Sequence, residues 1–129
     1  PIPSRGLGDV YKRQPFFKAL GLDLSAFYPA TLNLSLHPQT FEWLKPDYEF
    51  EHVKWIDGFA AETFWFAQCI ISFNDQNYPA WIYYPHPETK TQHFHSNQVL
   101  EIITKMVPNI QYGDKVILQY HPDNIRLSQ

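Results

Sequence analysis

Pro29-Ala30-Thr31-Leu32-Asn33-Leu34-Ser35-Leu36 is the stretch on which the fold assignment rests. From Thr31 onward polar residues and leucines alternate, with Thr31, Asn33 and Ser35 at one set of positions and Leu32, Leu34 and Leu36 at the other. Successive side chains of a β-strand point to opposite faces, so this alternation predicts a half-buried strand with one polar face. Thr31 and Asn33 are then expected to point the same way.

Most of the remaining chain also predicts short strands separated by turns. Further strands are expected at residues 48–55, 63–73, 80–84, 99–104 and 115–120. A helix is expected to end at Gly21, and residues 40–44 are expected to form one helical turn. Pro85 is expected to end its strand, with a polar loop following over residues 86–97. Many short strands and few helices indicate a mainly β domain, a compact barrel.

Composition and charge limit the classes of function. The chain has 129 residues, 44% of them apolar and 17% aromatic, which fits one domain with its own core. Its net charge of −3 argues against a nucleic-acid binder. Cys69 is the only cysteine, which excludes an internal disulfide and fits a reducing cytoplasm. No apolar run is long enough to span a membrane, so we expect no membrane contact. We also expect a cytoplasmic protein that is a monomer.

The first fourteen residues are expected to be non-native. Residues 4–14 read Ser-Arg-Gly-Leu-Gly-Asp-Val-Tyr-Lys-Arg-Gln, a reading-frame translation of a transposon-based sequencing adapter that ends in GATGTGTATAAGAGACAG. Such segments are set aside before the fold is considered, so Gly6 and Gly8 carry no weight as a phosphate loop. We expect residues 4–14 to make no core contacts and residues 15–129 to form the domain.

Two positions on predicted strands carry oxygen atoms suited to chemistry. The Thr31 hydroxyl and the Asn33 amide offer two neutral oxygens that suit Mg²⁺, which takes its other ligands from water and phosphates. A merely polar strand face, with threonine favoured by β-propensity, is the alternative. Glu101 stands in an apolar strand, where a carboxylate is costly unless it has a partner. It could bind a ligand or act as a base, or it could lie on an exposed edge.

The histidines and the single cysteine are the residues whose types could serve metal binding or nucleophilic chemistry. His93 and His95 are two residues apart, and His86 and Glu88 precede them, so a zinc site is one interpretation. Contacts to an anion or ligand, or simple solvation, are the alternatives. Cys69 lies among apolar residues, where a buried and inert thiol is expected.

Four stretches, in order, resemble the archaeal, CTP-dependent riboflavin kinases. They are Leu20-Gly21 with residues 28–34, residues 79–85, His95-Ser96 through Glu101-Ile102-Ile103, and Tyr112-Gly113-Asp114-Lys115-Val116. The resemblance covers nearly all of residues 15–129. It implies a cradle-loop barrel, which is a small closed barrel of the six-stranded type, with one or two short helices and its first strand missing. It also implies Mg²⁺-dependent transfer of a phosphoryl group from a nucleotide triphosphate to riboflavin, giving FMN.

The same resemblance implies roles for individual residues. Thr31 and Asn33 match the threonine and asparagine that hold the magnesium. Glu101 matches a glutamate that contacts the flavin, and it could draw the proton from the flavin's hydroxyl. The family's threonine eight residues earlier is His93 here, so His93 and His95 are expected to contact the flavin instead.

One departure from the family affects the expected activity. The arginine-bearing nucleotide turn after Ile103 is replaced by Thr104-Lys105-Met106-Val107-Pro108. A non-catalytic flavin-binding barrel, or a protein-interaction domain, is therefore the alternative. We expect flavin binding to persist without CTP specificity, with the flavin ring against aromatic side chains at Tyr83, Tyr84 and Phe94.

Overall fold

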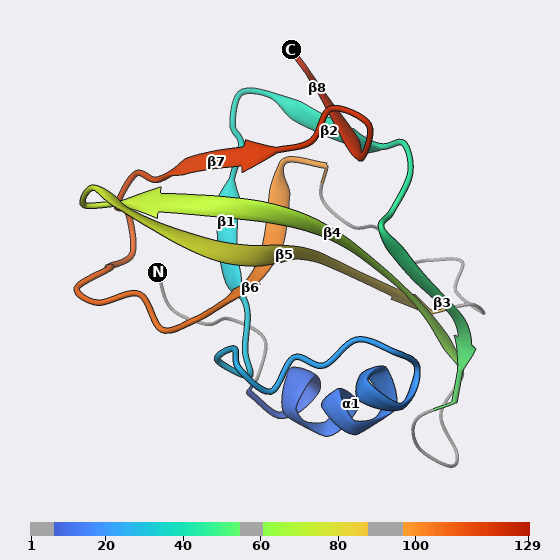
Figure 1. The fold of residues 1–129 in the computed structure, drawn as a ribbon. Coiled ribbons are helices and arrows are strands. Elements are labelled where there is room, and N and C mark those ends of the chain that lie inside the picture. Colours follow the sequence, from blue (N-terminus) through green and yellow to red (C-terminus); the bar gives the residue numbers. More distant parts are fainter. Residues whose placement is uncertain (1–6, 55–60, 88–96) are drawn as a thin grey trace.

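The protein is mainly β, as expected, and is described here by a computed structural model covering residues 7–54, 61–87 and 97–129 (Figure 1). Those ranges contain one helix and eight strands. The elements are α1 (Leu7–Ala19), β1 (Leu32–Ser35), β2 (Thr40–Trp43), β3 (Tyr48–Val53), β4 (Glu62–Phe73), β5 (Gln76–Pro87), β6 (Val99–Thr104), β7 (Ile117–Tyr120) and β8 (Ile125–Ser128). In the described part of the chain, no helix is both long and apolar enough to cross a membrane.

The strands form one large antiparallel sheet and one small one. The large sheet has the order β1-β6-β5-β4-β3, and β7 also pairs with β4. β3 pairs with the first half of β4, up to Phe66, and β7 pairs with the second half, from Cys69 onward. The small sheet consists of β2 and β8. Within the described ranges these ladders do not join into a closed barrel.

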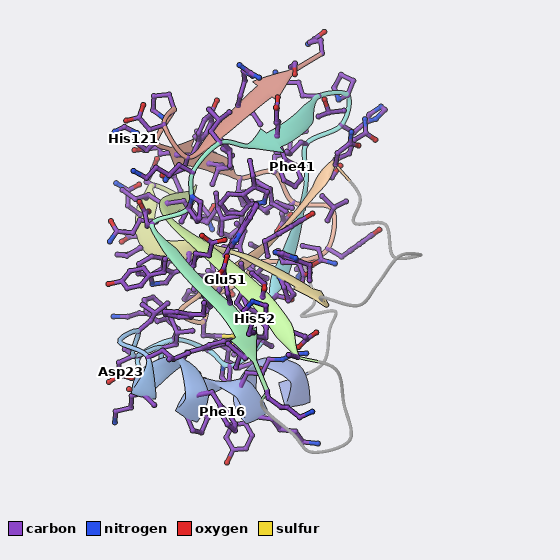
Figure 2. The ribbon with its side chains drawn as sticks, turned by 90° about the vertical axis from the view of Figure 1, so that its right-hand side faces the viewer. Phe16, Asp23, Phe41, Glu51, His52 and His121 are labelled. Atoms are coloured by element: carbon purple, nitrogen blue, oxygen red, sulfur yellow. The ribbon has the colours of Figure 1, made fainter. Side chains whose placement is uncertain are left out.

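The two faces of the large sheet bury two separate cores. On one face, called the helix face here, Phe64, Phe66, Trp81 and Tyr83 pack with Phe17 of α1. The opposite face, called the strand face, packs against β2 and β8. Figure 1 shows α1 at one end of the molecule and the β2–β8 pair at the other, with β4 and β5 between them. Figure 2, turned by 90°, shows Phe16 of α1 and Phe41 of β2 at these two ends.

The β4–β5 hairpin is longer than its sequence suggests. Its turn is made by Asn74 and Asp75, whose φ angles of 51° and 61° are typical of asparagine and aspartate in tight hairpins. The prediction that Pro85 ends its strand is wrong, because β5 continues to Pro87. On the side of β6, the pairing of β5 covers only Ala80 to Tyr83. Pro85 lies beyond the end of this β5–β6 ladder, where a residue without an N–H is tolerated.

The prediction of a helical turn over residues 40–44 is also wrong. β2 is a strand in which Phe41 is buried and Glu42 is exposed. Glu42 faces Arg126 across the β2–β8 ladder, and Arg126 Nη2 lies 2.7 Å from Glu42 Oε1. β8 was not expected, because four residues are too few for their alternation to be distinctive. Pairing between these distant segments, rather than local propensity, makes both of them strands.

Part of the segment expected to lack structure is helical and packed. α1 begins at Leu7, and Val10 is fully buried against the helix face. Arg13 is also buried, and its Nη2 lies 2.6 Å from Glu62 Oε1. The expectation that residues 4–14 make no core contacts is therefore wrong for Val10 and Arg13. The adapter origin of the segment stays a prediction.

Candidate functional site

Three of the residues singled out in the sequence meet on the helix face. Asn33 of β1 lies directly opposite Glu101 of β6 in the antiparallel register. Thr31, just before β1, donates a hydrogen bond from its Oγ1 to Glu101 Oε1 at 3.4 Å. Thr31 and Glu101 are 70 residues apart in sequence, so only the pairing of β1 with β6 brings them together.

The alternation of the β1 stretch explains this arrangement. Opposite residues of an antiparallel pair share a face, and Leu34 lies opposite Leu100 in the core of the strand face. Asn33 and Glu101 must then point to the other face. Leu34 is buried while Asn33 is exposed, which confirms a half-buried strand.

Glu101 is a partnered carboxylate, and it does not lie on an edge strand. β6 lies between β1 and β5 in the sheet, so Glu101 has ladder neighbours on both sides. It is half-buried, and Thr31, at 1% exposure, supplies a hydroxyl donor from beneath it. A carboxylate that accepts a hydrogen bond in a half-buried place keeps its charge at a lower cost than an isolated one.

Tyr83 extends this polar cluster beneath α1. Tyr83 lies opposite Glu101 in the β5–β6 ladder, and its hydroxyl accepts a hydrogen bond from Arg13 Nη1 at 3.3 Å. Burial raises the pKa of Tyr83 above its ordinary value; the carboxylates of Glu101 and Glu62 raise it further, while Arg13 opposes them. Tyr83 is therefore a neutral hydroxyl at physiological pH, next to a carboxylate of the candidate site.

The donor atoms of this cluster fit a hard cation. Thr31, Asn33 and Glu101 offer a hydroxyl, a carboxamide and a carboxylate, and hard oxygen donors are what Mg²⁺ prefers. Elsewhere, the described residues contain no group of three or more His, Cys, Asp or Glu side chains able to hold a metal. The candidate magnesium ligands are thus the two predicted residues, with Glu101 beside them.

Several predicted flavin contacts lie outside the described residues. His93, Phe94 and His95 all fall in residues 88–96, as does Glu88 of the considered zinc site. Tyr83 and Tyr84, the other aromatic side chains expected against the flavin ring, lie on opposite faces of the sheet. Tyr83 belongs to the core of the helix face, whereas Tyr84 packs in the core of the strand face.

An aromatic cluster on the strand face was not anticipated. Trp65 and Tyr84 lie opposite each other across β4 and β5, with ring centroids 5.9 Å apart. Trp43 of β2 meets both, at 5.5 and 5.6 Å, and the His86 ring lies 5.1 Å from Trp65. The signal in the sequence is that Trp65, Tyr84 and His86 occur at strand positions of one face. That β2 is a strand, and not a helical turn, is what adds Trp43.

Comparison with known proteins adds no family to these observations. The chain matches no protein-family model, and no curated protein is significantly similar to it. The resemblance described above therefore rests on the quoted residues alone.

Proposed function

We propose that this chain is a riboflavin kinase-like phosphotransferase that makes FMN from riboflavin and a nucleotide triphosphate with Mg²⁺. The observation that supports the proposal most is the meeting of Thr31, Asn33 and Glu101 on one face. These are the residues that the resemblance assigns to the metal and to the flavin. Asn33 and Thr31 come from the start of β1 and the residue before it, and Glu101 comes from β6.

The roles follow from what phosphoryl transfer demands. Catalysis of this reaction consists mostly of positioning and of neutralising phosphate charge. When bound, Mg²⁺ would supply that neutralisation, with Thr31 and Asn33 among its ligands. Glu101 would orient the flavin and accept the proton of its attacking hydroxyl. The bond from Thr31 fixes one carboxylate oxygen of Glu101, which holds that side chain in place.

A cradle-loop barrel is part of the proposal. One backbone hydrogen bond beyond the ladders supports it, because it connects β2 to the large sheet. Phe41 N donates to Asn97 O just before β6 at 2.8 Å, as barrel closure would require. A second bond, from Leu44 N to Asn124 O at 2.8 Å, extends the pairing of β2 with β8 inside the small sheet.

A flavin-binding barrel without kinase activity is the second candidate. It is favoured by the segment that stands where the family has its arginine-bearing turn. Thr104 and Val107 are buried, and Thr104 Oγ1 donates to Pro79 O at 3.0 Å. Tyr28 N also donates to Thr104 O at 3.0 Å. Thr104 and Val107 thus serve packing, so fewer residues of this segment can contact a nucleotide.

The kinase proposal is tested by FMN formation. The purified chain is incubated with riboflavin, Mg²⁺ and either CTP or ATP, and FMN is separated by chromatography. Asn33→Ala should abolish turnover without unfolding the protein, because Asn33 is exposed. Ser35→Ala is the matched control, since Ser35 lies on the same strand, is also exposed, and should leave activity within about twofold. Equal activity of both variants would exclude the metal role of Asn33.

Flavin binding is tested separately from turnover. Riboflavin fluorescence should be quenched on titration with the chain, and Glu101→Ala should weaken binding by about 1–3 kcal/mol through loss of a charge-assisted hydrogen bond. Binding without turnover would select the non-catalytic candidate. Failure of a folded sample to bind either riboflavin or FMN would exclude both candidates.

A further inference from the structure

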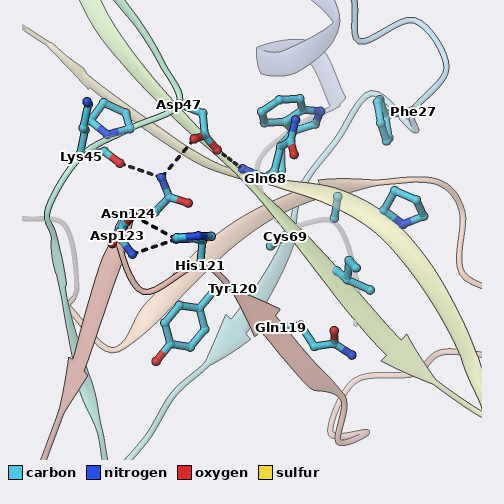
Figure 3. A pocket seen from close by; sticks show the side chains of 15 residues that line it. Phe27, Lys45, Asp47, Gln68, Cys69, Gln119, Tyr120, His121, Asp123 and Asn124 are labelled. Atoms are coloured by element: carbon cyan, nitrogen blue, oxygen red, sulfur yellow. Dashed lines mark hydrogen bonds and ion pairs between the residues drawn. The ribbon is translucent and has the colours of Figure 1, made fainter.

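A groove of about 1020 Å³ opens on the part of the helix face that lies beyond α1 (Figure 3). Its floor includes Gln68 and Ile70 of β4, Trp81 of β5 and Gln119 of β7. Phe27, from the segment between α1 and β1, also lines it. The volume lies at the upper end of the range of small-molecule sites. None of Thr31, Asn33 and Glu101 lines the groove, so it is separate from the candidate magnesium site.

One wall of the groove is held in place by a buried asparagine. Asn124, at 6% exposure, donates from Nδ2 to Lys45 O at 2.8 Å and to Asp47 Oδ1 at 3.2 Å. Asp47 Oδ2 in turn accepts from the backbone N–H of Gln68 at 2.8 Å. These bonds, drawn in Figure 3, bridge the place where β4 changes partner from β3 to β7. The wall is thus formed before any ligand arrives, which lowers the ordering cost of binding.

Two carboxamides in the groove have their hydrogen-bonding groups available. Gln68 and Gln119 are exposed, and their side chains make no hydrogen bond among the described residues. Each carboxamide offers a donor and an acceptor side by side. His121 adds a third polar group: its Nδ1 accepts from Asp123 N at 3.1 Å, and its ring is exposed.

The charges along the groove do not favour an anion. Lys45 is a cation, but the carboxylates of Asp47 and Asp123 also line the groove. Each oxygen of Asp47 already accepts a hydrogen bond from a protein donor, so this carboxylate is partly satisfied within the protein. The floor beside the carboxamides also has apolar side chains: Ile70 lies opposite Gln119, and Trp81 lies opposite Gln68. A flat, uncharged ring with polar edges matches these features.

We propose that this groove binds a nucleobase, presented as an uncharged nucleoside. A glutamine carboxamide can bind the adjacent donor and acceptor of a base edge with two hydrogen bonds, as it does with adenine. Apolar and aromatic side chains of the floor contact the face of the ring. The inference does not depend on the proposed kinase activity, because it uses other residues.

The test is titration of the full chain with adenosine and with uridine, followed by calorimetry and by the side-chain amide signals of ¹⁵N-labelled protein. At least one nucleoside should bind saturably and shift the signals of Gln68 and Gln119. Gln68→Leu or Gln119→Leu should lower its affinity at least tenfold. Gln76→Leu is the matched control, because Gln76 is exposed at the start of β5 outside the groove and should leave affinity unchanged.

Two further comparisons decide the ligand class and separate this site from the first one. Adenosine 5′-monophosphate should bind no more tightly than adenosine, and Asn33→Ala should bind nucleosides like the unaltered chain. The proposal is overturned if neither nucleoside binds, if both glutamine variants bind normally, or if the phosphate raises affinity more than tenfold. Loss of FMN formation in Asn33→Ala together with normal nucleoside binding would support both sites independently.

Discussion

At the scale of single residues, Glu101 shows how a neighbouring donor lowers the free-energy cost of a carboxylate in an apolar strand. A carboxylate in an apolar strand is destabilising unless something donates to it. The Thr31 hydroxyl donates to Glu101 at 3.4 Å, and Tyr83 lies opposite Glu101 on the neighbouring strand β5. Within the candidate site, Thr31 therefore supplies a hydrogen bond to the carboxylate of Glu101. Substitutions here should report on stability as well as on function.

Cys69 gives a prediction about pH. Burial raises the pKa of its thiol to about 12, whereas an unfolded cysteine titrates near 8.5. Above pH ~8.5 the unfolded chain therefore loses this proton while the folded chain keeps it, so the free energy of unfolding falls as the pH rises. By pH 10 this loss should reach about 2 kcal/mol.

The measurement is urea denaturation of the unaltered chain and of Cys69→Ala at pH 7.5 and at pH 10. The alanine variant should lose less stability over this interval, because it has no thiol to titrate. Tyrosines that titrate at high pH are common to both proteins and cancel in the comparison. An identical loss in both would show that Cys69 titrates normally in the folded state.

At the scale of elements, one buried ring of α1 packs against several aromatic rings of the sheet. Phe17 is fully buried, and its ring centroid lies 4.8 Å from that of Phe64 and 5.1 Å from that of Phe66, both edge to face. The preceding residue, Phe16, is 38% exposed. Phe16 and Phe17 are the same residue type on the same helix, but only Phe17 is buried. Alanine variants at the two positions therefore form a matched pair.

Phe17→Ala should lower the free energy of unfolding by about 3–5 kcal/mol, because it removes a buried ring and leaves a cavity. Phe16→Ala should cost less than about 1 kcal/mol, as is usual for a partly exposed position. Urea denaturation monitored by circular dichroism measures both. Similar costs for the two variants would mean that α1 is not docked through Phe17.

At the scale of the whole molecule, the large sheet is covered on its two faces by unlike elements. α1 covers part of the helix face, and the β2–β8 pair packs on the strand face. The first layer includes residues 7–14, which the sequence predicts to be adapter-derived. Val10 nevertheless lies in the core at 0% exposure. Experiments on this segment therefore test whether residues that are predicted to be adapter-derived take part in the layer on the helix face.

Hydrogen exchange of the intact chain should show backbone protection in residues 10–19, because they form a docked helix. Val10→Ala should accelerate exchange there and lower the free energy of unfolding by about 1–3 kcal/mol, through loss of buried apolar surface. Tyr11→Ala, at a position 65% exposed, is the control and should change neither quantity much. Rapid exchange of this segment in the unaltered chain would show that it does not dock.

Much of the architecture could be predicted because its signal is local. Alternation over residues 30–36 correctly identified a half-buried strand and the shared face of Thr31 and Asn33. The strands at residues 48–55, 63–73 and 99–104 were also predicted within a few residues, since apolar runs between turn residues are read from neighbours alone. The class of fold, mainly β with one helix, followed from these segments.

Other features were decided only when distant segments met. β2 and β8 are strands because they pair with each other, and neither has a distinctive pattern by itself. The groove exists because Asn124 bridges to Lys45 and Asp47, from a turn some eighty residues away. Tyr83 and Tyr84 are adjacent in a strand and therefore point to opposite faces, whereas Thr31 and Asn33 are two residues apart and share a face. Local periodicity thus determined which side chains share a face, whereas the tertiary pairing of strands determined which faces meet, because that pairing depends on contacts that no single stretch contains.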